Sequence, residues 1–237
     1  MVPLRVIATT PHGVVLSRPW GIALDGLLAS VLWHRRKWAA RRAGESLVYR
    51  PAEQPEPIDL PLARCGDPDV DQDWHWACTF ADLRFPEGVI DEPDIRWRTS
   101  RTDHRRLQDL APKVVGVSDK SGRYQRRLVP VMAHIATSLV WRGVGAPDEI
   151  RDLLAELPAI GKHTGTGEGV VKAWEVTEAA DDDWWSAGHE HAPGVLGRTS
   201  PPRCVRDDAA TRALTVGAVR PPYLHPGSRV PAYQPDR

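Results

Sequence analysis

Alternating apolar residues near the start of the chain predict a first β-strand over residues 4–9, with one face buried. The turn sequence Pro11-His12-Gly13 ends this run. Residues 22–33 then predict a helix, because apolar side chains recur there at helical spacing, at positions 24, 27, 28, 31 and 32. A cationic segment continues this helix to Arg42, and we expect it to be a solvated helix end.

The second half of the chain contains the clearest helix signal. Residues 147–157 begin with proline and acidic residues and place four apolar side chains on one face, Ile150, Leu153, Leu154 and Leu157. An alternating strand is predicted for residues 170–176. Further strands are predicted for residues 73–80 and 131–140, which are rich in β-forming residues. Beyond Thr177 no strong periodicity is present, so we expect irregular structure there.

Charge is balanced over the whole chain but is placed unevenly along it. The 31 Lys and Arg residues match 31 Asp and Glu residues, so any affinity for nucleic acid must come from local charge. Residues 53–94 are acidic and rich in proline, which predicts loops around one or two short strands. Residues 96–127 reverse the sign, and a turn sequence between two apolar runs predicts an exposed basic hairpin or loop.

The cysteine and histidine pattern gives no sign of a metal site. Cys65, Cys78 and Cys204 are odd in number and form no CxxC pair, which argues against a disulfide framework and against structural zinc. His189 and His191 alternate in a loop without nearby ligands, so we predict no metal and no cofactor. No signal-peptide pattern and no apolar run of roughly 18 residues is present, which favours a cytoplasmic protein without membrane contact.

A glycine-rich segment, residues 161–169, is the most informative motif. Its four glycines resemble a phosphate cradle, because glycine lets backbone N–H groups approach anionic oxygens. A nucleotide P-loop is improbable, since Glu156 stands at the first glycine position and His163 follows the lysine. The GxGxxG dinucleotide spacing is also absent. A simple tight turn remains the alternative, although one turn rarely needs four glycines.

Three blocks along the chain together resemble one protein family. They are the opening Pro3-Leu4-Arg5-Val6 strand with Leu24-Asp25-Gly26-Leu27-Leu28-Ala29, the loop and strand of residues 160–174, and the late Arg220-Pro221-Pro222-Tyr223-Leu224-His225-Pro226. A glycine-rich loop between the second helix and the last strand is a feature of the RAMP superfamily of CRISPR proteins. With the other two blocks, the chain is similar to the five-family subunit of type IV CRISPR effector complexes.

The resemblance implies an α+β, ferredoxin-like or RRM-like RAMP fold of βαββαβ order with a glycine-rich loop. Residues 1–177 would form this domain, with an acidic, proline-rich insertion near 50–94 and a basic thumb-like hairpin near 95–130. Residues 178–237 would be an irregular C-terminal extension packed on the same domain.

The resemblance also implies a non-catalytic subunit that binds the repeat-derived 5′ tag of a guide RNA. Its expected protein partners are the seven-family backbone RAMP subunits, which it would cap, and the type IV large subunit. Target nucleic acid, expected to be DNA, would be read by base pairing with the guide. The expected RNA contacts lie in the glycine loop, in the strand after it and in the basic tract: Gly161, Lys162, His163, Thr164, Gly165, Thr166, Gly167, Gly169, Lys172, Arg101, Arg105, Arg106, Lys120, Arg123, Tyr124, Arg126 and Arg127.

Two other functions remain open from the sequence. A metal-independent endoribonuclease that matures the guide RNA could use His163 as a general base, or Tyr124, His104 and Lys120 in the basic tract. A protein-only scaffold could use the glycine loop to dock another subunit. We expect several tryptophans to be core residues rather than stacking platforms, namely Trp74, Trp76, Trp174 and Trp184.

Overall fold

The structure is a computed structural model of the 237-residue chain. It describes residues 1–18, 20–45, 47, 53, 56, 58–100, 103, 106, 109, 120–121, 125, 127–206 and 212–236. Within these residues, no helix is both long enough and apolar enough to cross a membrane.

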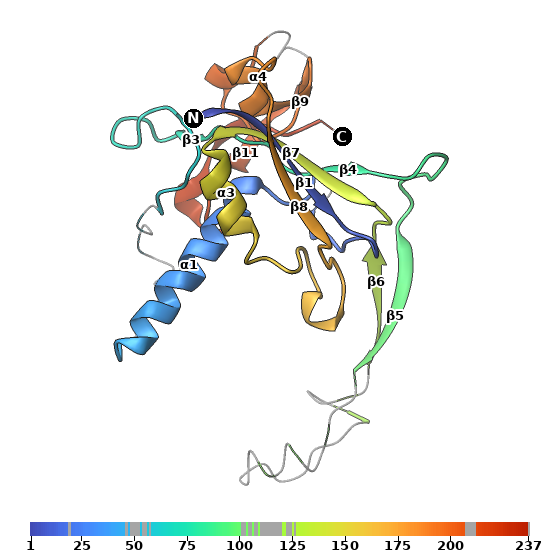
Figure 1. Ribbon diagram of the computed structural model, residues 1–237. Coiled ribbons are helices and arrows are strands. Elements are labelled where there is room, and N and C mark those ends of the chain that lie inside the picture. Colours follow the sequence, from blue (N-terminus) through green and yellow to red (C-terminus); the bar gives the residue numbers. More distant parts are fainter. Residues whose placement is uncertain are drawn as a thin grey trace.

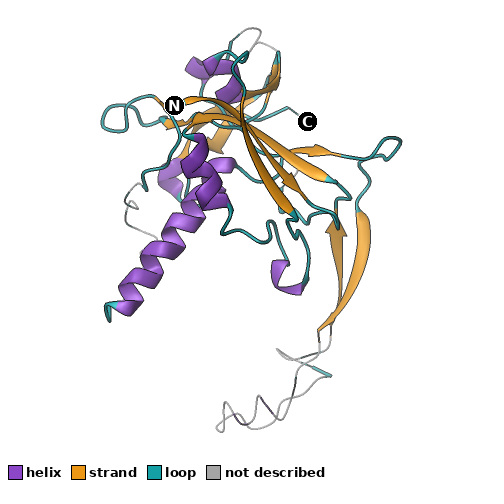
Figure 2. Cartoon of the chain, in the orientation of Figure 1, coloured by secondary structure: helices purple, strands orange, loops and turns teal. Residues whose placement is uncertain are grey.

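A four-stranded antiparallel sheet forms the centre of this α+β protein (Figures 1 and 2). Its strands, in spatial order, are β4 (Asp82–Arg84), β7 (Ser138–Gly145), β1 (Val2–Thr9) and β8 (Ala173–Glu178). The chain order of these strands and the two helices among them is β1, α1 (Leu24–Arg42), β4, β7, α3 (Pro147–Leu154) and β8.

The core lies between one face of this sheet and the two helices. Alternate β1 residues Leu4, Val6 and Ala8 are fully buried, as the alternation predicts. They join Leu28 of α1 and Ile150 of α3, among others, in one apolar cluster. Burial of this cluster supplies the main driving force for folding.

Both predicted helices are confirmed. The second ends at Leu154 rather than at the expected Leu157. Backbone N–H groups of Glu156 and Leu157 bond to carbonyl oxygens three residues earlier, so the last turn tightens before Pro158.

The single strand predicted for residues 131–140 is wrong. The segment contains the end of β6 (Arg127–Ala133) and the start of β7, which belong to different sheets. Between them the Thr10 hydroxyl donates a hydrogen bond of 2.9 Å to the Ala136 carbonyl oxygen, and Val14 bridges to His134. These tertiary contacts break the strand where local propensity favours continuing it.

The strand predicted for residues 73–80 is also largely wrong. Only β3 (His75–Trp76) is regular, and it pairs with β2 (Arg64–Cys65). With β4, the described part of the acidic tract contains three short strands among loops, where one or two were expected. Trp74 and Trp76 are core residues, as expected.

A two-stranded hairpin leads from the sheet into the basic tract. It consists of β5 (Asp94–Ser100) and β6, paired antiparallel from Asp94 opposite Ala133 to Ser100 opposite Arg127. Figure 1 shows the hairpin projecting away from the sheet and helices. The hairpin lies within the basic region expected near residues 95–130, but the first apolar run of the predicted hairpin, residues 114–117, lies outside the described residues, so that pairing stays a prediction.

The C-terminal segment is more regular than predicted. Its elements are α4 (Trp184–His189), β9 (Glu190–Ala192), β10 (Val195–Leu196), the 3-10 turns η3 (Pro202–Cys204) and η5 (Pro226–Ser228), and the paired strands β11 (Leu214–Ala218) and β12 (Arg229–Tyr233). Arg198, which is 1% exposed, bonds to carbonyl oxygens of Trp76, Cys78 and Val219. Such long-range partners order segments that show no periodicity in sequence. Trp184 is 40% exposed, so its expected place in the core is wrong.

Candidate nucleic-acid interface

The glycine loop, residues 161–169, adopts backbone conformations that three of its glycines make possible, since Gly161, Gly167 and Gly169 all have positive φ angles. Gly161 and Gly169 have φ angles of +88° and +64°. A Cβ atom at Gly169 would lie 1.8 Å from the Ile160 carbonyl oxygen, and one at Gly161 would lie 2.5 Å from that of Val15. The two ends of the loop therefore require glycine because the chain passes close to other backbone. This requirement explains part of the glycine pattern without any ligand.

The middle of the loop is open. Gly165 and Gly167 have no atom of the described residues within 4 Å of where a Cβ would lie. Lys162, His163 and Thr164 are exposed, and His163 has a left-handed backbone with φ of 61°. Among the described residues, none accepts a hydrogen bond from the backbone N–H groups of His163, Thr164 or Gly165. Consecutive free N–H groups near a left-handed residue can bind an anion.

Lysine side chains border this open segment. Lys162 is held through its backbone N–H, which bonds to the Val15 carbonyl oxygen at 2.8 Å, while its side chain is left exposed. Lys172, just before β8, is exposed as well. Neither lysine makes an ion pair with another described residue. Their charge is thus available to a ligand.

A buried glutamate joins the loop to the hairpin. Glu168 is 1% exposed, and its carboxylate forms ion pairs with Arg96 and Arg98 of β5. The Arg96 pair measures 2.5 Å between Nη1 and Oε2. Arg96 also bonds to Asp94 and to the His12 carbonyl oxygen. These contacts keep the glycine loop at the base of the projecting hairpin.

The predicted contacts in the basic tract are only partly covered by the structure. Arg106, Lys120 and Arg127 are described and exposed. The other five predicted contacts, Arg101, Arg105, Arg123, Tyr124 and Arg126, lie outside the described residues, as does His104. The structure therefore places the glycine loop at the base of the hairpin. That the five residues outside the described part contact RNA stays a prediction.

Two of the sequence blocks described above, residues 24–29 and 220–226, contact each other inside the protein. The Tyr223 hydroxyl donates a 2.7 Å hydrogen bond to Asp25 Oδ1. Asp25 is fully buried, and this burial raises its pKa to about 6 against the opposing effects of Arg198 and Tyr223. Neither partner was predicted to interact, because 198 residues separate them. This contact has a structural role, because it joins residues 220–226 to α1.

A cleft of about 1,310 Å³ lies beside this contact. Its lining includes Trp33, Trp74 and Arg220, which could bind an aromatic or anionic group. Acidic side chains also line it, namely Glu53, Glu56, Asp69 and Asp71. This mixed charge makes the cleft a poorer phosphate site than the glycine loop.

A second group of polar residues was missed by sequence reasoning. Cys65, His75, His189 and Cys204 place their ligand atoms within 4.8 Å of one another. The prediction of no metal rested on the wide spacing of the cysteines and on the weakness of a His189/His191 pair. That argument does not hold in three dimensions, because His189 joins residues from three other elements and His191 takes no part.

Comparison with known protein families found no family model that matches the chain, and comparison with curated protein sequences found no match.

Proposed function

We propose that this chain is a non-catalytic guide-RNA-binding subunit of a type IV CRISPR effector complex, with an α+β RAMP fold. In this role the glycine loop and the β5–β6 hairpin hold the 5′ tag of the guide. The observation that carries the proposal is the exposed, cationic loop with free backbone N–H groups, fixed by Glu168 at the base of a basic hairpin. Single-stranded RNA is bound by such cationic grooves.

The arrangement of the sheet supports the fold assignment. The strands of the central sheet and the two main helices come in the chain order strand, helix, strand, strand, helix, strand, with β2, β3, β5 and β6 as additional strands between them, and the spatial order of the sheet is β4-β7-β1-β8. A ferredoxin-like βαββαβ unit needs this order, with its first and third strands at the centre. The glycine loop lies between α3 and β8, as in the RAMP proteins that the sequence resembles.

Contacts among the resembling blocks also support it. The strand block pairs with the strand after the glycine loop, with Val6 opposite Val176. The Leu24–Ala29 block contacts the late block through Asp25 and Tyr223. Blocks that lie far apart in sequence thus build one continuous body, which is expected if they belong to one fold.

The test is binding of the purified chain to a labelled repeat RNA over a salt series. We expect the Lys162→Ala/His163→Ala variant to bind about tenfold more weakly or worse, because it loses charge-assisted contacts to phosphate. The slope of log affinity against log salt should become shallower by about 0.7 for each lost phosphate contact.

A matched control keeps this result specific. Lys37→Ala removes the same charge from α1, outside the glycine loop. It should bind like the unaltered chain. Equal losses in both variants would indicate diffuse attraction to a charged protein instead of a loop site.

Two other outcomes would replace the proposal. Specific cutting of the RNA without added divalent ions, lost in His163→Ala, would make the chain a metal-independent endoribonuclease. No RNA binding, together with salt-insensitive assembly with partner subunits, would favour the protein-only scaffold. Intact RNA with loop-dependent binding is the outcome that supports a tag-binding subunit and its association with seven-family backbone subunits, the large subunit and, through the guide, target DNA.

A further inference from the structure

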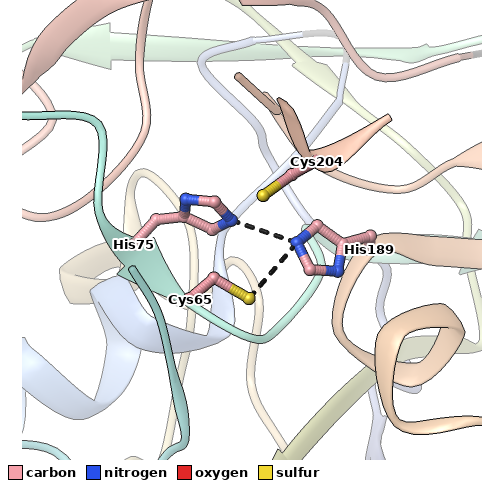
Figure 3. Close-up of side chains that lie close together, drawn as sticks. All are labelled: Cys65, His75, His189 and Cys204. Atoms are coloured by element: carbon pink, nitrogen blue, oxygen red, sulfur yellow. Dashed lines mark hydrogen bonds between the residues drawn. The ribbon is translucent and has the colours of Figure 1, made fainter. Parts of the chain in front are cut away.

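Four side chains that can bind a metal ion meet at one point in the fold (Figure 3). They come from β2, β3, the last residue of α4 and the last residue of η3: Cys65, His75, His189 and Cys204. Both histidines are fully buried, Cys65 is 9% exposed and Cys204 is partly buried. Cysteine and histidine side chains brought together and withdrawn from water need a chemical explanation.

Backbone carbonyl groups orient both imidazole rings. His75 Nδ1 lies 3.0 Å from the Asp73 carbonyl oxygen, and His189 Nδ1 lies 2.8 Å from that of Trp185. A carbonyl oxygen can only accept, so each Nδ1 carries a proton and Nε2 is the ring atom left to bind a cation. The two Nε2 atoms lie 3.0 Å apart. Two lone pairs at this distance repel each other unless a proton or a metal ion lies between them.

Two of the separations are close to those of tetrahedral zinc, and all four ligand atoms lie within 4.8 Å of one another. With ordinary Zn–N and Zn–S bond lengths, two nitrogen ligands lie about 3.3 Å apart and a nitrogen and a sulfur about 3.6 Å apart. Here the two Nε2 atoms are 3.0 Å apart, and Cys65 Sγ is 3.6 Å from His189 Nε2. Two thiolates with two imidazoles suit Zn²⁺ better than Mg²⁺ or Ca²⁺, which prefer oxygen.

We propose that the chain binds one structural Zn²⁺ ion in a Cys₂His₂ centre, formed by Cys65, His75, His189 and Cys204. Four protein ligands leave no open position for substrate, so the ion has a structural and not a catalytic role. The centre links the β2–β3 pair to α4 and η3 in the C-terminal segment. The inference is independent of RNA binding.

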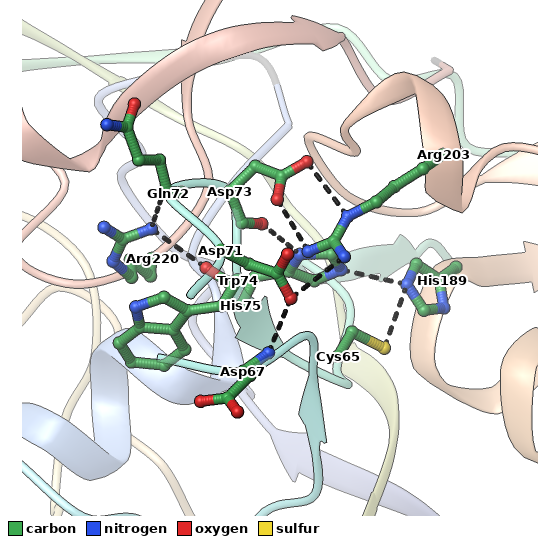
Figure 4. A network of polar contacts seen from close by, with 10 residues as sticks. All are labelled: Cys65, Asp67, Asp71, Gln72, Asp73, Trp74, His75, His189, Arg203 and Arg220. Atoms are coloured by element: carbon green, nitrogen blue, oxygen red, sulfur yellow. Dashed lines mark hydrogen bonds and ion pairs between the residues drawn. The ribbon is translucent and has the colours of Figure 1, made fainter. Parts of the chain in front are cut away.

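Residues around the cluster support its ligands. Figure 4 shows Arg203, the neighbour of Cys204, bound to the carboxylates of Asp71 and Asp73 at 3.2 and 2.6 Å. Asp73 also holds His75 through its carbonyl group. Trp185 stacks on the His189 ring with centroids 5.1 Å apart. Outer contacts of this kind fix ligand orientation in metal sites.

In the chain without a metal ion, burial and the contact between the two sulfur atoms set the pKa values of these side chains. Burial lowers the pKa of His75 to about 4, so its ring is neutral at neutral pH. A hydrogen bond between the two thiols lowers the pKa of Cys204 and raises that of Cys65, because the pair shares one proton. Zn²⁺ would displace this proton when it binds both sulfurs.

The first test is the zinc content of the full chain, purified without a histidine tag after growth in zinc-containing medium. Mass-spectrometric metal analysis should give one zinc per chain after gel filtration. Cys204→Ala and His189→Ala should each lose most of this zinc. Cys78→Ala is the matched control, because Cys78 is a buried cysteine outside the cluster, and it should retain one zinc per chain.

Cobalt substitution of the unaltered chain tests the geometry even if the variants fail to fold. Tetrahedral Co²⁺ with two thiolates should give intense visible d–d bands and near-ultraviolet thiolate charge-transfer bands, and added Zn²⁺ should abolish both. Three results overturn the proposal: a chain without bound metal, substoichiometric zinc retained equally by the ligand variants, or a Cys65–Cys204 disulfide in peptides mapped without reductant.

Discussion

Asp25, in the first turn of α1, buries its carboxyl group completely. One of its oxygens, Oδ2, has no hydrogen-bond partner among the described residues. Its pKa is raised from the ordinary 3.8 to about 6. The folded protein therefore binds this proton more tightly than the unfolded chain does. The resulting stabilisation is complete below the unfolded pKa and is lost as pH rises through about 6.

We expect Asp25→Asn to be more stable than the unaltered chain at pH 8 but not at pH 4. The difference between the pKa values of 3.8 and about 6 corresponds to about 3 kcal/mol of free energy. This is the largest increase in the free energy of unfolding that we expect for Asp25→Asn at pH 8. An amide keeps the acceptor for Tyr223 without the buried charge. Urea unfolding of both proteins at each pH measures the difference.

Asp148→Asn is the control for this prediction, because Asp148 is an exposed carboxylate in the first turn of α3. Its effect should stay below about 1 kcal/mol at both pH values. A loss of stability in Asp25→Asn that is the same at pH 4 and pH 8 would show that the charge on Asp25 is not the destabilising feature.

At the level of elements, one glutamate couples the glycine loop to β5. We expect Glu168→Gln to lower the free energy of unfolding by about 1–3 kcal/mol, because it leaves the charges of Arg96 and Arg98 without their buried partner. The loss of stability should be smaller than for a fully buried ion pair, since both arginines are about a third exposed and water screens their charges. Thermal or urea unfolding measures the change.

Glu156→Gln provides the comparison, since Glu156 pairs with Arg35 at the surface, where both side chains are about half exposed. That substitution should cost less than about 1 kcal/mol. If the two substitutions cost the same, Glu168 does not anchor the loop, and the position of the loop beside the hairpin needs another cause.

At the scale of the whole molecule, the four-residue cluster and Arg198 tie the C-terminal segment to the rest of the fold. If the cluster holds Zn²⁺, a strong chelator should speed amide hydrogen exchange in α4 and η3. The central strands β1 and β7 should stay largely protected, because the main apolar core contains none of the four cluster residues and only Val144, near the end of β7, packs with Cys65 and Cys204. Exchange measured by mass spectrometry before and after chelation tests this expectation.

Added zinc should restore the slow exchange, and Cys204→Ala should exchange rapidly without any chelator. Unchanged exchange in α4 and η3 after complete removal of the metal would mean that packing alone holds this segment. Loss of protection across all elements would mean that the ion stabilises the whole fold and not only its C-terminal part.

The sequence by itself determined the elements whose signal is local. The first strand and both main helices follow from periodicity, proline and charge placement, because each depends on residues close in the chain. The glycine loop was also visible, since its glycines are adjacent. Its coupling to Arg96 and Arg98 was not, because an ion pair between residues about 70 apart leaves no periodic signal.

Only the tertiary structure decided the break between β6 and β7, the order of the C-terminal segment and the assembly of the metal-ligand cluster. Each depends on partners that are distant in sequence, such as His75 and His189, which are 114 residues apart. Spacing rules for zinc sites detect ligands on short turns, whereas here the fold brings single ligands from separate elements together. The four ligand residues lie far apart in the sequence, which argued against a metal site, but the folded chain brings them close together.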